Sequence, residues 1–277
     1  MSITLRSNVA SLVSQRHVGN TQSSLNRSLA RLSSGFRINS ATDDAAGLGV
    51  SEVLKSQIRT LAQASRNASD GLSVVQTAEG AMGEISSALL RMRELSVQAA
   101  SDNITDKERG YINTEFSDLK SEVDRIAKST KFNGSVLLDG SFKTNGLDFQ
   151  VGHEAGTDFR ITVTIADVTT TGLALAGTDA VDTKANAQAV MTKLDASLDT
   201  LNTARAGLGA KANRLTTAAS AVDVMRENLS SANSRIRDTN IASETSSFAR
   251  AQVLMQAGVS MLAQSNVQPQ LALSLLR

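Results

Sequence analysis

Residues 61 to 92 read LAQASRNASDGLSVVQTAEGAMGEISSALLRM, and their apolar and small side chains recur at alternating intervals of three and four. This spacing is typical of a helix that packs along one seam against a neighbouring helix. The seam positions are Leu61, Ala64, Ala68, Gly71, Val75, Ala78, Met82, Ile85, Leu89 and Met92. A helix from about residue 44 to 100 would be roughly 85 Å long at 1.5 Å per residue, so the stretch predicts a rod.

A second seam of comparable length lies in the C-terminal half of the chain, beginning near Thr183. Its positions again alternate steps of three and four, and they are Val190, Leu194, Ser197, Leu201, Ala204, Leu208, Lys211, Leu215, Ala218, Val222, Met225, Leu229, Ala232 and Ile236. Two such seams in one chain predict that the chain folds back on itself and brings its two halves side by side.

The sequence between the two seams lacks a long helical repeat and instead contains signals for a short helix, a hairpin and a loop. Thr105 and Glu108 have the spacing of a capping box, which predicts a further helix to about Lys128. Apolar β-forming residues at 147–151 and 159–165 flank a turn and predict a β-hairpin, while residues 167–182 predict a surface loop or a short strand. The expected fold is mainly α, with long antiparallel helical rods in a coiled-coil bundle and a small β-hairpin region near 147–165.

The amino-acid composition argues against several kinds of functional site. The chain has one proline, Pro269, no cysteine and only two histidines, His17 and His153, so disulfides, thiol nucleophiles and zinc clusters are not expected. The adjacent carboxylates Asp43 and Asp44 are predicted to cap the helix that begins after them. No catalytic constellation is found, and we expect a protein that is not an enzyme and that holds no cofactor or metal.

The charge is nearly balanced overall but unevenly distributed. A net charge of +1 argues against a protein that binds nucleic acid, although five arginines precede the first acidic residue, Asp43. A basic amphipathic start could be a membrane-surface helix, a transit peptide or a nucleic-acid arm, but a helical face that meets solvent or a partner is favoured. No apolar run is long enough for a membrane span or a cleavable secretory signal, so we expect no membrane insertion.

The C-terminal segment is apolar without being amphipathic. No charged residue occurs from Ala251 to Leu276, and the large apolar side chains fall on several helix faces. Such a helix is predicted to be buried, with each large side chain contributing on the order of 2 kcal/mol. The chain alone does not obviously supply the partners for this burial.

Several motifs carry a resemblance to a known family. They are RLSSGFRINSATDDAAG at 31–47, LRMRELSVQ at 90–98, FNG at 132–134, RIRDTN at 235–240 and QPQ at 268–270. In combination they are very similar to those of bacterial flagellin, and the resemblance extends over residues 1–165 and 185–277. It implies a structural subunit that polymerises into the flagellar filament, the helical propeller for swimming.

The resemblance also implies a domain organisation. Residues 1–40 with 237–277 would form the inner helical domain at the filament core, and residues 41–236 the outer rod domain with its hairpin. No large variable surface domain is expected, so the filament would be thin and smooth. The candidate contacts between subunits are Leu5, Val9, Leu12, Leu25, Leu29, Leu32, Leu254, Met261, Leu271, Leu273 and Leu276.

Partners and location follow from the same resemblance. The chain would contact itself, the filament cap and hook-filament junction proteins, and a cytosolic export chaperone on its C-terminal segment. It would leave the cell through the flagellar type III apparatus, without a cleavable signal peptide, and lie in the extracellular filament.

The family includes ligands of an innate immune receptor of the host, and residue-by-residue matching places Arg91, Leu95 and Glu115 on the candidate receptor surface. Subunit contact is the alternative role for these residues, and Leu90 stands where well-recognised members carry Gln.

Three other classes of protein share parts of this pattern. A hook-filament junction protein has similar terminal helices, but the signature at 31–47 favours flagellin. A helical signalling rod would explain the seams but not the uncharged C-terminal segment. A membrane-active amphipathic protein would explain the basic start but not the paired seams.

Overall fold

The computed structural model describes residues 7–274, and the side chains of residues 7–267. Its helices are α1 (Val9–Ser34), α2 (Ala45–Ala99), α3 (Asp106–Ser129), α4 (Lys184–Arg237) and α5 (Ile241–Ser274). The short strands are β1 (Lys131–Phe132), β2 (Ser135–Val136), β3 (Leu147–Gln150) and β4 (Arg160–Val163), and η1 (Thr157–Phe159) is a 3-10 turn. The mainly helical fold with small antiparallel sheets is therefore confirmed.

Two compact units divide the chain, and each is described by itself. Unit 1 comprises Met1–Ser56 with Asn228–Arg277, and unit 2 comprises Gln57–Glu227. Both limits lie inside the long helices α2 and α4. The domain division at residues 40 and 237, which follows from the family resemblance, stays a prediction.

The core of unit 2 is built on the two seams. Each of the seam positions between Leu61 and Met92 is buried on α2, and from Ala68 onward the apolar ones share one hydrophobic cluster with side chains of α3, α4 and the hairpin. On α4 the seam is buried or half-buried as far as Val222, but Met225 is 46% exposed. The prediction fails at Met225 because the hydrophobic cluster already ends near Leu215 and Ala219.

Two hairpins cover part of this core. Strands β3 and β4 pair antiparallel, with Leu147 opposite Val163 and Gln150 opposite Arg160, which confirms the predicted hairpin. The ring of Phe149 packs on Gly71 of α2, where a Cβ atom would lie only 3.0 Å from the ring carbon Cγ. A methyl group at position 71 would therefore require the Phe149 ring to move by a few tenths of an ångström.

The segment 167–182 is irregular but not simply a surface loop. Val168, Leu173, Leu175 and Val181 are buried in the hydrophobic cluster. Polar side chains of α3 hold the segment in place: the backbone and side chain of Thr170 donate to Asp124, and Lys120 donates to the carbonyls of residues 176, 177 and 179. The expectation of a surface loop is thus wrong in part, because the segment carries core residues.

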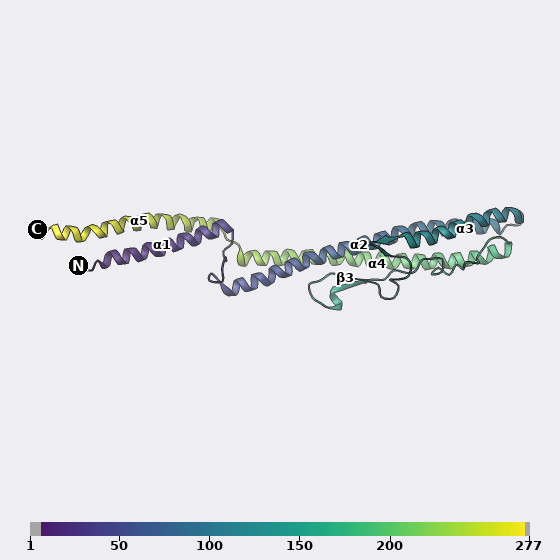
Figure 1. Cartoon of the computed structure of the whole chain (residues 1–277), viewed down its shortest axis with the longest axis horizontal. Coiled ribbons are helices and arrows are strands. Elements are labelled where there is room, and N and C mark those ends of the chain that lie inside the picture. Colours follow the sequence, from purple (N-terminus) through teal and green to yellow (C-terminus); the bar gives the residue numbers. More distant parts are fainter. Residues whose placement is uncertain (1–6, 275–277) are drawn as a thin grey trace. The chain divides into compact units, whose positions relative to one another are not determined.

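Unit 1 is built on the antiparallel pair α1 and α5, which lie side by side (Figure 1). The Asn8 amide donates to the Ser265 carbonyl at 2.8 Å at one end of the pair, and Arg31 approaches Glu244 to 3.7 Å at the other. Small side chains lie between the helices: Ser11, Ser28 and Ala251 are buried, and Gly258 faces Val18. Larger apolar side chains of the two helices, such as Val18, Leu25, Met255 and Leu262, are half-buried.

Two connections of unit 1 are fixed by polar contacts. Phe36, after α1, forms a bridge with Asp238, and the Arg237 guanidinium lies over the Phe36 ring at 4.8 Å from its centroid. The carboxylate of Asp44 accepts a hydrogen bond from the Gly47 N–H at 2.8 Å, while Asp43 accepts from the backbone of residues 39 and 40. Asp44 thus caps α2, as predicted.

Candidate functional site

The first candidate site is the apolar surface that α1 and α5 turn away from each other. Large side chains on it are more than half exposed, including Leu12 at 61%, Leu254 at 54% and Met261 at 65%. We call this set the outer apolar surface, and its members are Val9, Leu12, Leu29, Val253, Leu254, Val259 and Met261. Exposed large apolar side chains gathered on one helix pair are typical of a surface that contacts another molecule.

The predicted subunit contacts fall into three groups. Val9, Leu12, Leu29, Leu254 and Met261 belong to the outer apolar surface and are open to another molecule. Leu25 and Leu32 are half-buried, because they continue the line of Ser11 and Val18 at intervals of seven along the face of α1 that meets α5. Only part of each of these two side chains is open to another molecule, and their role as subunit contacts stays a prediction. Leu5, Leu276 and the side chains of Leu271 and Leu273 lie outside the described residues.

The uncharged C-terminal helix is mostly uncovered in the single chain. The sequence predicts burial, yet Val253, Leu254 and Val259 are each at least half exposed. The physical reason is that α1 offers one face to α5: Ala251 is buried and Met255, Gly258 and Leu262 are half-buried, while the other faces of α5 stay open. The apolar side chains on the open faces of α5 therefore need another molecule to bury them.

The second candidate site lies on α2 and α3, where Arg91 and Glu115 meet. The Nε atom of Arg91 is 2.9 Å from a carboxylate oxygen of Glu115, and its Nη1 atom is 3.1 Å from Glu94. Both members of the first pair are about half exposed. The hydrogen bonds with Glu115 and then with Glu94 raise the pKa of the Arg91 guanidinium. The pair is preformed and accessible.

Leu95 does not belong to that surface. It is 1% exposed and lies in the core of unit 2, so its assignment as a surface contact is wrong. The reason is its spacing, because Leu95 follows Met92 by three residues and extends the buried seam of α2. The exposed apolar residues on this part of α2 are instead Leu90 and Val97. Together with Arg93, Glu94 and Gln98 they line an open depression of about 520 Å³.

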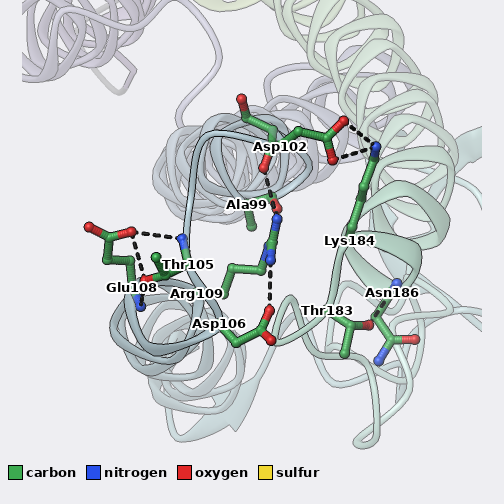
Figure 2. Close-up of polar contacts among 10 residues, drawn as sticks. Ala99, Asp102, Thr105, Asp106, Glu108, Arg109, Thr183, Lys184 and Asn186 are labelled. Carbon is green, nitrogen blue, oxygen red and sulfur yellow. Dashed lines mark hydrogen bonds and ion pairs between the residues drawn. The ribbon is translucent and has the colours of Figure 1, made fainter.

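A polar cluster fixes the turn between α2 and α3 (Figure 2). Arg109 of α3 is buried and donates to the carbonyls of Ala99 and Ser101, both at 2.8 Å, and to the carboxylate of Asp106 at 2.7 Å. These carbonyls belong to the end of α2, where the helix itself provides no donors. The Lys184 ammonium lies 2.7 Å from Asp102 and joins the start of α4 to the same turn. Sequence reasoning missed Arg109, since one arginine in a helix carries no periodic signal.

The predicted capping box closes the other side of this turn. The Thr105 hydroxyl accepts a hydrogen bond from the Glu108 N–H, and the Thr105 N–H donates to the Glu108 carboxylate at 2.7 Å. Hydrogen bonds from the backbone and then the hydroxyl of Thr105 lower the pKa of the Glu108 carboxyl. The box begins α3 and confirms the start that the sequence predicts.

The lowered pKa of Glu108 has a consequence for stability against acid. A group whose pKa is lower in the folded state stabilises fully above its unfolded pKa and loses this contribution as the pH falls through the folded pKa. We therefore expect Glu108→Gln to lower the thermal midpoint near neutral pH, and the difference from the unchanged protein to shrink as the pH falls below about 4.3, the usual pKa of a Glu carboxyl. Circular dichroism melts across this range measure it.

The matched control is Glu84→Gln. Glu84 is an exposed carboxylate of α2 that makes no hydrogen bond or ion pair with any described residue. Its substitution is expected to shift the midpoint little at any pH. A Glu108→Gln effect that stays constant down to about pH 3 would argue against the capping contribution.

The two histidines lie apart in the sequence, one on α1 and one between β3 and β4. Within residues 7–274, no group of three or more His, Cys, Asp or Glu side chains is placed to hold a metal ion. His153 lies edge-on to the Phe159 ring at 5.6 Å between ring centroids, and His17 is exposed on α1. A search of the same described part of the chain finds no helix that is both long and apolar enough to cross a membrane.

Comparisons with known proteins agree with the motifs of the sequence. The family model of the bacterial flagellin N-terminal helical region matches residues 5–143, and that of the C-terminal helical region matches residues 191–276. A flagellin of Halalkalibacterium halodurans is 42% identical, and flagellin FlaB2 of Treponema pallidum is 41% identical. Each alignment covers 98% of this chain and 98% of the relative.

A solved structure supports the fold. A Vibrio parahaemolyticus protein described as hook-associated aligns with a TM-score of 0.59 at 15% identity. The alignment covers 71% of this chain and 100% of the other. At this level of identity the likeness concerns the fold alone.

Proposed function

This chain belongs to the bacterial flagellin family, and from that premise we propose that its outer apolar surface is completed by other copies of the same chain. The protein is a structural subunit that polymerises into the flagellar filament, the propeller for swimming motility. The matches to both flagellin models favour this function over a hook-filament junction protein or a signalling rod. The observation that carries the proposal is the outer apolar surface, whose large side chains are more than half exposed in the single chain.

The energetics of this pair favour assembly. Burying a large aliphatic side chain stabilises by roughly 1.5–3 kcal/mol, whereas the small residues between α1 and α5 contribute much less. Within the pair the fully buried side chains are small, and larger ones such as Leu25, Met255 and Leu262 are only half-buried, so the pair gains part of the available apolar stabilisation alone. Copies that cover Leu12, Leu254 and Met261 supply the missing apolar burial, so we infer that the inner helices are completed by polymerisation.

The same reasoning supports the division into domains. We propose that residues 1–40 and 237–277 form the inner domain at the filament core and residues 41–236 the outer domain. The pairing of α1 with α5 supports this division, as do the non-helical connections at residues 35–44 and 238–240. The outer domain then carries the seams and the hairpin.

Partners other than the chain itself are also proposals. An export chaperone would cover the C-terminal segment, and the exposed side chains Val253, Leu254 and Met261 support such a need. The filament cap and hook-filament junction proteins would contact the same inner helices. An innate immune receptor would read the exposed Arg91 and Glu115 pair, without Leu95.

Membership of the flagellin family gives the general location of the protein. The protein is a component of the extracellular flagellar filament. Its passage through the flagellar type III apparatus stays a prediction, as does the expectation that it catalyses no reaction. A structural role needs no catalytic group.

Leu254→Asp tests the proposed assembly surface. A carboxylate at this position would be buried against apolar side chains of another copy, without a partner charge. We expect polymerisation onto filament seeds, followed by light scattering and electron microscopy, to fall by about tenfold or more. The helical content and thermal midpoint of the free subunit should change little, because Leu254 is exposed in the single chain.

Val224→Asp serves as the matched control for charge and exposure. Val224 lies on α4 in unit 2 and is 59% exposed, close to the value for Leu254. We expect this variant to polymerise at nearly the unchanged rate. Normal assembly of Leu254→Asp would contradict the role of the outer apolar surface.

A further inference from the structure

The methionines of this chain differ widely in their exposure. Because the chain has no cysteine, methionine provides its only sulfur atoms. Met82 and Met92 are fully buried in unit 2, whereas Met225 is 46% and Met261 is 65% exposed. Oxidation of a thioether requires contact with the oxidant, so Met225 and Met261 are the described methionines most open to it.

Met261 is also placed where a polar group would matter most. It belongs to the outer apolar surface, seven residues after Leu254 on α5 and therefore close to the same line along the helix. The surrounding segment from Ala251 to Leu276 contains no charged residue. Met225 is nearly as accessible, but it lies on α4 in unit 2, away from this segment in the sequence.

We propose that Met261 is an oxidation site that switches off subunit addition: a peroxide converts its thioether to the sulfoxide, and the oxidised subunit no longer joins the filament. This inference rests on the proposed burial of the outer apolar surface between copies. The accessible form is the free subunit before assembly. Once the subunit is assembled, its neighbours cover Met261 and protect it.

The chemistry needs only the peroxide as co-reactant. A lone pair of the Met261 sulfur attacks one peroxide oxygen, so that an S–O bond forms while the O–O bond breaks. The sulfur loses two electrons, and the peroxide oxygens gain them. The departing oxygen leaves as water after proton transfer, and the sulfur keeps one oxygen as the sulfoxide.

The effect on assembly follows from the polarity of the product. The thioether is a flexible apolar group that fills gaps between side chains, whereas the sulfoxide oxygen is a strong hydrogen-bond acceptor. An apolar contact offers that oxygen no donor, so burial leaves it unsatisfied. Folding of the free subunit is unaffected, since Met261 is exposed in the single chain.

The test uses the full chain with hydrogen peroxide as the probe. Free subunits are treated, the oxidant is removed, peptide mass spectrometry locates the sulfoxides, and growth on filament seeds is measured. Unchanged protein and Met225→Leu are expected to lose about tenfold or more of their elongation rate after treatment. Met261→Leu, a substitution that nearly conserves volume, is compared with its own untreated elongation rate, and peroxide is expected to leave that rate unchanged because position 261 then carries no sulfur.

Two further measurements sharpen the test. Methionine sulfoxide reductases should restore growth of the oxidised unchanged protein, and peroxide applied to finished filaments should leave Met261 largely unmodified. Loss of growth in treated Met261→Leu, or normal growth of subunits shown to carry the Met261 sulfoxide, would overturn the switch alone. Untreated protein that never polymerises would overturn the proposed filament function and the switch together.

Discussion

A chain that lacks residues 1–40 is expected to form no filaments, while unit 2 keeps its own cooperative unfolding transition. The deletion removes α1, which is the only helix that covers α5 within the described part of unit 1. It also removes Leu12 and Leu29 from the outer apolar surface. The same contacts form between every pair of neighbouring subunits in a filament. Their loss therefore weakens each step of subunit addition, and we expect no polymer.

Electron microscopy and sedimentation measure this outcome, and circular dichroism follows the transition of unit 2. Deletion of residues 238–277 is the reciprocal experiment and is expected to give the same result, because it removes α5 and leaves α1 unpaired. The seams and hairpin of unit 2 lie outside both deletions. Filaments from either truncated chain, with normal morphology, would contradict the proposed inner domain.

Much of this fold could be predicted because its main contacts repeat with the helical period. The seam from Leu61 to Met92 identifies a face, and that face is buried in the structure. The capping box at Thr105 and Glu108 and the β3–β4 hairpin are local patterns, and the structure contains both. Local chemistry and a fixed period are sufficient to place such elements.

Periodicity cannot tell which molecule covers a face. Leu25 and Leu254 both have apolar helical spacing, yet Leu25 is half-buried within the chain and Leu254 is exposed. The distinction depends on the rotation of α1 and α5 about their axes, which small residues such as Ser11 and Gly258 determine. Leu95 was predictable as a buried residue, because it continues the seam after Met92.

Contacts between distant segments left no pattern in the sequence. Arg109 is buried because the end of α2 presents free carbonyls to it. The segment around Leu173 and Leu175 is buried because Lys120 and Asp124 hold its backbone. In both cases a single polar side chain provides the anchor, and its partner is a backbone group that any residue could supply.

Phe116→Ala is expected to destabilise unit 2 by about 3–5 kcal/mol, the usual cost of deleting a fully buried aromatic side chain. Phe116 is 0% exposed on α3 and belongs to the hydrophobic cluster that joins α2, α3 and α4. The chain has few aromatic residues, so a neighbouring Leu or Val would have to move far to fill the space. For a unit of this size the thermal midpoint should fall by roughly 2–4 °C per kcal/mol.

Tyr111→Ala provides the matched control on the same helix. Tyr111 is an aromatic residue of similar size on α3, but it is 66% exposed. Its removal creates no cavity, so a change within about 0.5 kcal/mol is expected. If both variants melted alike, α3 would not be packed as the structure shows, because helix propensity rises by a similar amount in the two substitutions and only burial separates them. A large loss confined to Phe116→Ala would instead show that α3 is an integral part of the core that the two seams build.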